Sequence, residues 1–392
     1  MGDRLGMKKA IIISCFDWYE KRIEPLVQIL SPEYQVRVLL SDFDHIKKET
    51  MEKKYKSCTY IHVLPYKRNI SVTRILSHIQ FGQKVKGYLK EYRPDVIYVL
   101  LPPNNVAAQC LKYKQRNEKS KLVVDIIDLW PESMPLGKFD KTFLAHIWRK
   151  WRDDSIKGAD LVITECDLYQ EKLKYVLKDQ LVVTNYIFKE DTAGILENVR
   201  ADKFINKKVV LGYVGSINNI LDIELVGKIL CALKDAGILV ECKVIGDGDH
   251  REQFLRMLEG SASVEYYGQI FDEKEKYKIL SECDYGLNIM KSTVSVGLSI
   301  KSVDYFSYGI PIINNVRGDT WKLVEQNGLG INVTDDLNAL AEELCTRKIN
   351  TQDIIDCFQL LFTREAYISN AKQALLRVGV YGRVNAYTPL FK

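Results

Sequence analysis

The chain has 392 residues, of which 46% are hydrophobic and 27% charged, and its formal net charge is +5. This length is too great for one ordinary hydrophobic core and predicts two domains of roughly 190 residues each. No stretch approaches the roughly 18 apolar residues of a membrane-spanning helix, and the apolar run at residues 10–13 is too short for a signal peptide, so we expect a cytoplasmic protein.

The first half of the chain alternates short β-branched runs with helical patterns, as parallel βαβ units do. The expected strands are residues 9–14, 34–40, 59–64, 96–100, 122–127, 161–164 and 181–184. The expected helices are residues 20–30, 71–91, 106–115, 139–157 and 167–176. Solid apolar runs such as residues 96–100 indicate strands that are buried on both faces.

A polar segment at residues 188–208 has no clear period, and a second alternating series follows it. Its expected strands are residues 209–215, 240–245, 264–267, 285–289, 310–314 and 330–333, with helices at 224–236, 252–259, 273–281 and 321–326. The predicted fold class is therefore α/β, with two tandem doubly wound Rossmann-like domains. We expect an N-terminal domain at 1–188, a C-terminal domain at 189–363, and a helix at 364–392 that returns to the first domain, as does the helix at 353–362.

In a doubly wound sheet, ligands bind at the carboxyl ends of the strands, so the loops that follow strands are candidate ligand loops. In the second half these are Gly215, Ser216, Ile217 and Asn218; Gly246, Asp247 and Gly248; and Gly268, Gln269 and Ile270. Glycine permits close backbone approach and N–H groups before a helix attract anions, so the first loop is expected to line an anion pocket and the third to read a nucleobase edge. Capped helix starts and plain turns would look the same. The loops lack the full glycine fingerprint and the following acid of a dinucleotide-dependent dehydrogenase.

The segment at residues 296–315 joins a glycine-containing turn, a short helix and the entry to a strand. Gly297, Leu298, Ser299 and Ile300 form the turn, and Asp304 lies one turn into the helix. The N–H groups of the turn and the positive end of the helix dipole suit a phosphate, and a carboxylate suits ribose hydroxyls. The alternative is an ordinary crossover in which Asp304 is only a first-turn helix acid.

Two carboxylates, Asp128 and Glu132, follow the expected strand at 122–127. Asp128 in particular can orient a sugar hydroxyl or assist deprotonation of an acceptor, whereas the structural alternative is that Trp130 and Pro131 pack beneath this loop. Two helices that combine basic and apolar side chains, at 71–91 and 143–152, would rest on an anionic membrane surface or, alternatively, face the core with a solvated basic face.

Taken together, these motifs resemble the glycosyltransferases of the GT-B fold, and in particular family 4, a large group of retaining enzymes. The resemblance rests on YVGS at 213–216, VIGDG at 244–248, VEYYG at 264–268, GLSIKSVDY at 297–305 and GIPII at 309–313. DIIDLWPE at 125–132 is also similar to members that build bacterial surface polysaccharide. The resemblance spans nearly the whole chain and is strongest at residues 209–330.

The sequence departs from the family pattern at two points. Many members have two glutamates, separated by seven residues, that contact the donor; here these positions are Val296 and Asp304. The basic pair that grips the donor diphosphate near Gly215 is also absent, with Ser216 and Asn219 or Ile220 at about those positions. Lys301 is the expected replacement, because a first-turn lysine opposes the helix dipole unless an anion compensates it.

The resemblance implies retaining transfer of a sugar from a nucleotide-sugar, expected to be a UDP-sugar, to a lipid-linked or saccharide acceptor at the cytoplasmic membrane face, with possible peripheral contact with anionic lipid. The expected catalytic residues are Asp128 and Lys301, and the expected acceptor contacts are Asp17, Trp18, Tyr19 and Arg22. The nine cysteines and five histidines form no ligand-spaced cluster, and no metal, cofactor or nucleic-acid partner is expected. The alternatives are a non-catalytic GT-B partner subunit, which Val296 favours, and a nucleotide-sugar 2-epimerase, for which a matching carboxylate and histidine set is lacking.

Overall fold

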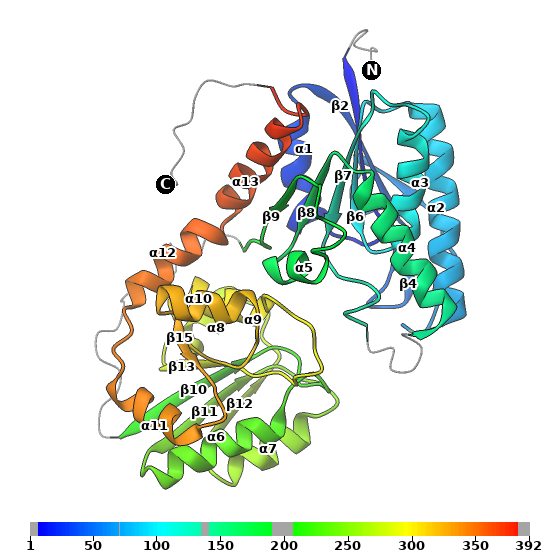
Figure 1. Ribbon diagram of the computed structural model, residues 1–392. Coiled ribbons are helices and arrows are strands. Elements are labelled where there is room, and N and C mark those ends of the chain that lie inside the picture. Colours follow the sequence, from blue (N-terminus) through cyan, green and yellow to red (C-terminus); the bar gives the residue numbers. More distant parts are fainter. Residues whose placement is uncertain (1–6, 70, 135–140, 190–206, 383–392) are drawn as a thin grey trace. The chain divides into compact units, whose positions relative to one another are not determined.

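The computed structural model describes residues 7–69, 71–134, 141–189 and 207–382. The chain divides into two compact units (Figure 1). Unit 1 comprises Met1–Ile187 and Tyr367–Lys392, and unit 2 comprises Phe188–Ala366.

Unit 1 is built on a seven-stranded parallel sheet with the strand order β5-β2-β1-β6-β7-β8-β9. The strands are β1 (Lys8–Ser14), β2 (Tyr34–Ser41), β5 (Cys58–Ile61), β6 (Val96–Leu101), β7 (Lys121–Ile126), β8 (Leu161–Thr164) and β9 (Val182–Thr184). A short antiparallel pair, β3 (Phe43–Asp44) and β4 (Glu49–Thr50), lies outside this sheet. Every residue of the central strand β6 is buried, which explains why it reads as an unbroken apolar run.

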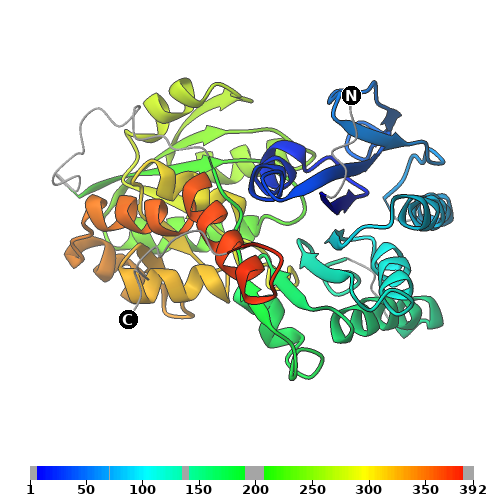
Figure 2. The same ribbon diagram turned by 90° about the horizontal axis from the view of Figure 1, so that it is seen from above.

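Helices cover both faces of the unit 1 sheet. They are η1 (Tyr19–Ile23), α1 (Glu24–Leu30), α2 (Val72–Tyr92), α3 (Asn104–Lys114), α4 (Phe143–Lys157), α5 (Asp167–Lys172) and α13 (Arg364–Arg377). Helices α2, α3 and α4 lie side by side on one face (Figures 1 and 2). Leu26 and Leu30 of α1 share a core cluster with Ala371 and Leu375 of α13, so the end of the chain completes the first unit.

Unit 2 is built on a six-stranded parallel sheet with the order β12-β11-β10-β13-β14-β15. Its strands are β10 (Lys208–Val214), β11 (Leu239–Ile245), β12 (Ser263–Gly268), β13 (Tyr285–Asn288), β14 (Ile312–Asn314) and β15 (Gly330–Asn332). Its helices are α6 (Ile223–Asp235), α7 (Arg251–Glu259), α8 (Glu273–Leu280), α9 (Ile300–Ser307), α10 (Asp319–Asn327), α11 (Leu337–Thr346) and α12 (Thr351–Leu361). The two doubly wound sheets confirm the predicted fold class.

One expectation about the last helices is wrong. Helix α12, expected to pack on the first domain, packs on α9 and α10 within unit 2. Its buried face brings Phe358 and the adjacent Phe362 together with Phe306 of α9; the rings of Phe306 and Phe362 stack at 6.3 Å. The sequence also gave no expectation of α11, whose Leu340 and Leu344 join the unit 2 core.

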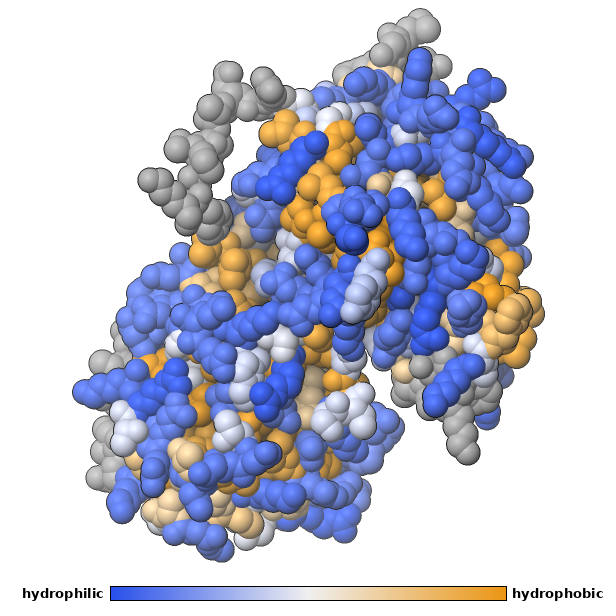
Figure 3. Space-filling model, viewed as in Figure 1, coloured by the Kyte–Doolittle hydropathy of each residue, from blue (hydrophilic) through white to orange (hydrophobic). Residues whose placement is uncertain are grey.

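Apolar side chains are exposed at the edge of unit 1 where α2 and α4 begin (Figure 3). The exposed side chains in these turns are Val72, Leu76, Phe143 and Leu144. Within the described ranges, no helix combines the length and hydrophobicity needed to cross a bilayer.

Candidate functional site

The loops after β10 and β11 lock together through glycines. Gly215, Gly246 and Gly248 have φ angles of +121°, +140° and +155°, which L side chains rarely adopt. A Cβ on Gly246 would lie 1.9 Å from the carbonyl oxygen of Gly215, and one on Gly248 would lie 2.3 Å from that of Ile217. Glycine is therefore required at these two positions by backbone contact alone.

Several N–H groups in these two loops are used for hydrogen bonds within and between the loops. Those of Gly215, Ile217 and Gly246 donate to the carbonyl oxygens of Ile245 (3.0 Å), Asp247 (2.9 Å) and Gly268 (2.7 Å), respectively. The Gly248 N–H donates to the Asp247 carboxylate at 2.8 Å. An anion at this edge of the sheet therefore needs other partners.

Lys301 lies directly against the β10 loop. Ser299 is the N-cap of α9 and its hydroxyl accepts from the Ser302 N–H at 3.0 Å, which places Lys301 second in the helix. The Lys301 Nζ donates to the Tyr213 hydroxyl at 2.7 Å and lies 4.2 Å from the centre of that ring. A Cβ on Gly215 would be only 2.9 Å from the Lys301 Cε. The side chain is thus held at the carboxyl end of β10, where a ligand of this fold is expected.

No carboxylate forms an ion pair with Lys301 in the described part of the chain. Burial lowers the pKa of its amine to about 8, and no opposing charge offsets this effect. The amine also stands in the first turn of a helix, where the dipole disfavours a cation. A bound phosphate would relieve both costs, so the arrangement matches the predicted role of Lys301.

Asp304, the predicted ribose contact, is engaged within unit 2. Its Oδ1 accepts from the Lys189 Nζ at 2.8 Å, and the same amine lies 2.8 Å from the Glu273 carboxylate. Burial acts to raise the pKa of Glu273, but hydrogen bonds from Lys189, Lys276 and Tyr308 hold it at about 2. Lys189 and Asp304 are 115 positions apart, so no sequence pattern indicated this pair.

Three asparagines at the ends of β13, β14 and β15 form a ladder across the sheet, which we call the asparagine ladder. Asn288, Asn314 and Asn332 are register partners. Asn288 donates to Asn314 at 2.8 Å, Asn314 donates to Asn332 at 2.7 Å, and Asn332 donates to the Trp321 carbonyl at 3.0 Å. At the other end, the Ser299 hydroxyl donates to the Asn288 Oδ1 at 2.7 Å. The ladder therefore fixes the start of α9, which carries Lys301.

The asparagine ladder was not predicted, although the sequence contains one signal of it. Each of three strands at the crevice side of the sheet ends in asparagine, a residue that is depleted in strands. Only the strand register brings the three amides together.

The other predicted donor residues differ in their exposure to solvent. Ser216, Gln269 and Ile300 are exposed, Asn218, Asp247 and Ile270 are half-buried, and Leu298 is buried. The Gly297 carbonyl accepts from the Thr320 N–H at 2.8 Å and from its hydroxyl at 3.0 Å, which fixes the turn before α9.

In unit 1, Asp128 contacts the tryptophan two positions further on. Its Oδ2 accepts from the Trp130 indole N–H at 2.7 Å. Glu132 instead pairs with Arg149, at 3.1 Å, and with Arg152. Asp128 therefore positions Trp130 and stays half-exposed, whereas Glu132 belongs to an ion-pair cluster on α4.

Among the predicted acceptor contacts, Asp17 and Trp18 lie in the loop after β1, and Tyr19 is the first residue of η1. Asp17 is exposed and accepts from the Tyr19 N–H at 3.2 Å, and Tyr19 stacks on Tyr55 at 3.9 Å. Trp18 is half-buried against the unit 1 core. This loop leaves polar and aromatic groups available at the carboxyl edge of the sheet.

Arg22 requires a correction, because it is fully buried and does not face a ligand. Its guanidinium binds Asp125 at 3.0 and 3.1 Å and Glu165 at 2.8 Å. Burial, partly offset by Arg22, raises the pKa of Glu165 to about 7. A buried cation needs such partners, so Arg22 is an internal ion-pair residue and not an acceptor contact.

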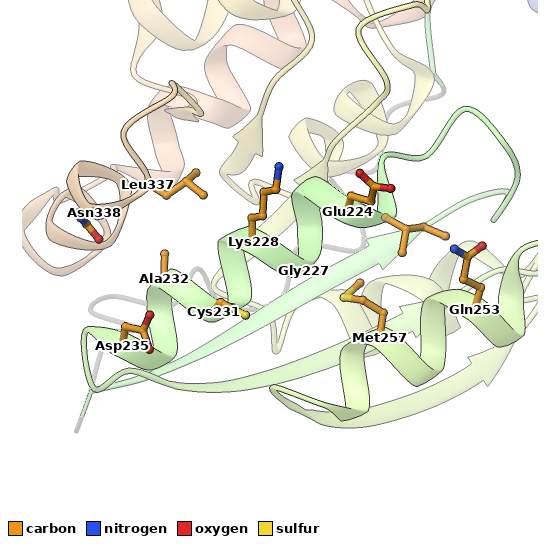
Figure 4. Close-up of a pocket in the computed structure, with 11 residues that line it drawn as sticks. Glu224, Gly227, Lys228, Cys231, Ala232, Asp235, Gln253, Met257, Leu337 and Asn338 are labelled. Carbon is orange, nitrogen blue, oxygen red and sulfur yellow. The ribbon is translucent and has the colours of Figure 1, made fainter.

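A separate groove lies on the outer surface of unit 2, between α6, α7 and α11 (Figure 4). It has a volume of about 740 Å³. Glu224, Lys228, Asp235 and Met257 line it, and none of the predicted site residues does. Among the described residues, no group of three His, Cys, Asp or Glu side chains could hold a metal ion.

Solved structures share this two-unit architecture. Sucrose-phosphate synthase from Thermosynechococcus elongatus is similar at 14% identity and a TM-score of 0.63, covering 95% of this chain and 99% of its own. The lipopolysaccharide outer core galactosyltransferase WaaB is similar at 15% identity and a TM-score of 0.64, with 95% and 99% covered. HepE from Anabaena, in complex with UDP and glucose, is similar at 15% identity and a TM-score of 0.61, with 94% and 100% covered. These similarities establish the GT-B fold.

One family model matches part of unit 2. Residues 208–347 match the family model of group 1 glycosyl transferases. Comparison with curated protein sequences gave no match. The chain thus has the predicted GT-B fold, and the segment that matches the group 1 glycosyl transferases lies in the unit that carries Lys301 and the glycine loops.

Proposed function

We propose that the protein transfers a sugar from a UDP-sugar to a saccharide or lipid-linked acceptor in surface polysaccharide synthesis, with retention of configuration. The observation that carries this proposal is Lys301, a half-buried amine in the first turn of α9 that has no carboxylate partner among the described residues. It stands against the loop of Gly215, in the unit that matches the group 1 glycosyl transferases. Such a cation requires an anion, and the donor diphosphate is the anion that this reaction releases.

Lys301 suits the chemical demand of this reaction. Breaking the bond between sugar and diphosphate places negative charge on the leaving group, and a fixed cation in a partly dehydrated site stabilises that charge. The Tyr213 hydroxyl holds the amine and in turn donates to the Ser216 carbonyl at 2.7 Å. Lys301 thus needs little reorganisation when the donor binds.

The identity of the substrates rests on analogy. HepE has been solved in complex with UDP-glucose, and a trehalose-6-phosphate enzyme from E. coli with UDP-2-fluoro glucose. WaaB and WaaG are named as lipopolysaccharide glycosyltransferases. These relatives support a UDP-sugar donor and an acceptor on a growing surface glycan at the membrane face.

A non-catalytic GT-B subunit is the second candidate, because one contact favours it. Asp304, at the position of the family's second donor-contacting glutamate, is paired with Lys189, and Val296 stands at the position of the first. A catalytic site requires the carboxylate of Asp304 to exchange Lys189 for ribose or to bind both.

Calorimetry with UDP, GDP and their glucose and N-acetylglucosamine derivatives tests the proposal. We expect UDP to bind and Lys301→Met to weaken binding roughly 10- to 100-fold, because a hydrogen bond between charged groups contributes about 1.5–3 kcal/mol. Lys301→Arg should keep most of the affinity. Lys228→Met, on the exposed outer face of α6, is the matched control and should bind as the wild type does.

The outcomes separate the two candidates. Nucleotide binding together with slow release of UDP from one UDP-sugar supports the transferase, and proton NMR of the glycoside product reports whether the anomeric configuration is retained. Binding of no nucleotide by the folded protein would refute the donor site, and the non-catalytic subunit would then be favoured.

A further inference from the structure

Buried polar atoms that lack hydrogen-bond partners gather around Trp130 in unit 1. They are the Nε of Arg74, both ring nitrogens of His78 and the Oδ1 of Asn104. The Arg74 guanidinium lies 4.5 Å from the Trp130 ring, the His78 ring stacks on it at 5.9 Å, and the Asn104 amide donates to its carbonyl at 2.9 Å. Because buried polar atoms are normally paired, this concentration indicates a site that is incomplete without a ligand.

Arg74 is an unusual cation. It lies in the first turn of the 21-residue helix α2, where the dipole disfavours positive charge. It is only 8% exposed, and its described hydrogen bond from Nη1 goes to a neutral acceptor, the Asn69 carbonyl, at 2.7 Å. Asp128 hydrogen-bonds Trp130 and acts on Arg74 only through its charge, and Arg74 also shares a side-chain hydrogen bond with Tyr66. Arg74 therefore repeats, in unit 1, the features that distinguish Lys301 in unit 2.

Further basic groups surround Arg74. Lys48 lies 5.2 Å from the Tyr66 ring, and the Arg74 guanidinium lies 5.5 Å from the same ring. Lys48 is held in a left-handed conformation with φ +64°, and its Nζ donates to the neutral oxygens of His45 and Asn69. Burial, followed by the charge of Arg74, lowers the pKa of Lys48 and of His45. Burial and Arg74 likewise lower the pKa of His78 to about 3, so this ring is neutral.

The cluster lies at the ligand-binding edge of the sheet. Phe16 follows β1 and Trp130 follows β7, and Arg74 lies 5.9 Å from the first ring and 4.5 Å from the second. Carboxyl ends of parallel strands hold ligands in this fold. Val72 and Leu76 in the same two turns of α2 are exposed, on the face of the helix roughly opposite to Arg74.

We propose that Arg74 and Lys48 bind a phosphate or diphosphate group of the acceptor, with His78 lining the site and Asp128 placed for the adjoining sugar hydroxyls. This inference rests on the proposed transferase function and names its acceptor class. A planar guanidinium over an aromatic ring and a neighbouring lysine amine are suited to phosphate oxygens. A lipid-borne diphosphate and a soluble sugar phosphate offer the same anionic group, and the experiment below distinguishes these two sources.

The test uses inorganic pyrophosphate as the probe and the Lys301→Met protein as the background, so that binding at the donor site is suppressed. We expect saturable pyrophosphate binding by this protein in calorimetry. Adding Arg74→Met should weaken that binding at least roughly tenfold, whereas Arg74→Lys should restore part of it. Adding Arg116→Met, which removes an exposed cation of unit 1, is the matched control and should leave pyrophosphate affinity unchanged.

A second readout does not depend on an Arg74 variant. Pyrophosphate added to ¹⁵N-labelled Lys301→Met protein should shift the ring nitrogen resonances of His78 and His45, and those of the exposed His146 should stay in place. Tighter binding of farnesyl diphosphate than of pyrophosphate supports the proposal with a lipid-borne acceptor, and equal binding supports it with a soluble one.

Two results would overturn the proposal: absence of pyrophosphate binding by the folded Lys301→Met protein, or binding that Arg74→Met leaves unchanged while the His78 resonances do not move. The proposed function is judged separately, by UDP binding to the wild-type protein. If pyrophosphate does not bind but UDP affinity is intact, the acceptor site proposed in unit 1 is wrong and the donor site in unit 2 is not contradicted.

Discussion

Replacing Asn314 with leucine should destabilise unit 2 and weaken donor binding together. The side chain is fully buried and central in the asparagine ladder. Besides its two ladder contacts, it donates to the Val316 carbonyl at 3.2 Å and accepts from the Val316 N–H at 3.1 Å. Leucine has a similar volume, so the change removes hydrogen bonds without leaving a large cavity.

The expected loss of unfolding free energy can be worked out from the polar groups that lose their hydrogen-bond partners. Asn314→Leu leaves the Asn288 amide N–H, the Asn332 Oδ1 and the Val316 N–H without partners, and each unpaired buried group costs about 1–3 kcal/mol. Allowing for relaxation, we expect a loss of about 3 kcal/mol in the free energy of unfolding of unit 2. UDP affinity should fall as well, because the ladder fixes Ser299 and thereby Lys301.

Native-state hydrogen exchange of the full chain measures the first effect, since it reports unit 2 amides separately from unit 1 amides. Asn314→Asp has the same size but buries a carboxylate and sets its second oxygen against the Asn332 Oδ1 and the Val316 carbonyl, so it should cost at least as much stability. Asn338→Leu, an exposed asparagine in the first turn of α11, is the control and should change stability by less than about 0.5 kcal/mol. If Asn314→Leu costs no more than this control, the ladder does not stabilise the sheet edge.

Three further outcomes follow from the geometry. Gly246→Ala should lower the yield of folded protein and abolish UDP binding, because its Cβ would lie 1.9 Å from the Gly215 carbonyl oxygen. Circular dichroism measures the folding and calorimetry the UDP binding. Folding and UDP binding equal to those of the wild type would contradict the loop contact. UDP affinity should decline as the pH rises through the Lys301 pKa of about 8, because only the protonated amine attracts the diphosphate; binding near that pH should take up protons, and Lys301→Arg should remove this pH dependence. Arg22→Met should cost about 3–5 kcal/mol of unfolding free energy by leaving two buried carboxylates without their cation. Without Arg22 the pKa of Glu165 rises above its wild-type value of about 7, so the variant takes up this proton at a higher pH than the wild type does. The loss should therefore be largest at high pH and shrink as the pH falls toward about 7, and urea unfolding that shows the same loss at every pH would contradict this reasoning.

The fold could be predicted because buried parallel strands such as β6 consist of continuous apolar runs in the sequence. It also indicated Lys301, since the conflict between a lysine and a helix N-terminus is a local property. The fate of Arg22 could not be predicted, because its partners lie 103 and 143 positions away and meet it only in the folded sheet. The pairing of Asp304 with Lys189 was inaccessible for the same reason.

The acceptor side was harder to predict than the donor side. Arg74 appeared in the sequence only as one of several basic residues along an amphipathic helix, most of which are solvated. What distinguishes it is the set of contacts with Trp130, Phe16 and Tyr66, which come from three separate segments. A site assembled from one residue per segment leaves no spacing to recognise.

The hydrogen bonds of the asparagine ladder all run in one direction, and the acceptor at its Trp321 end sets that direction. Each amide presents its carbonyl to one neighbour and its NH₂ to the next, so no single amide can rotate without placing two donors or two acceptors face to face. The Ser299 hydroxyl would tolerate either orientation, but the Trp321 carbonyl can only accept. A backbone oxygen of α10 thus determines, through three side chains, which way a hydroxyl points at the start of α9. The direction of the hydrogen bonds along this edge of the sheet is therefore set by Trp321, which is more than ten residues in sequence from Lys301, the residue whose position depends on it.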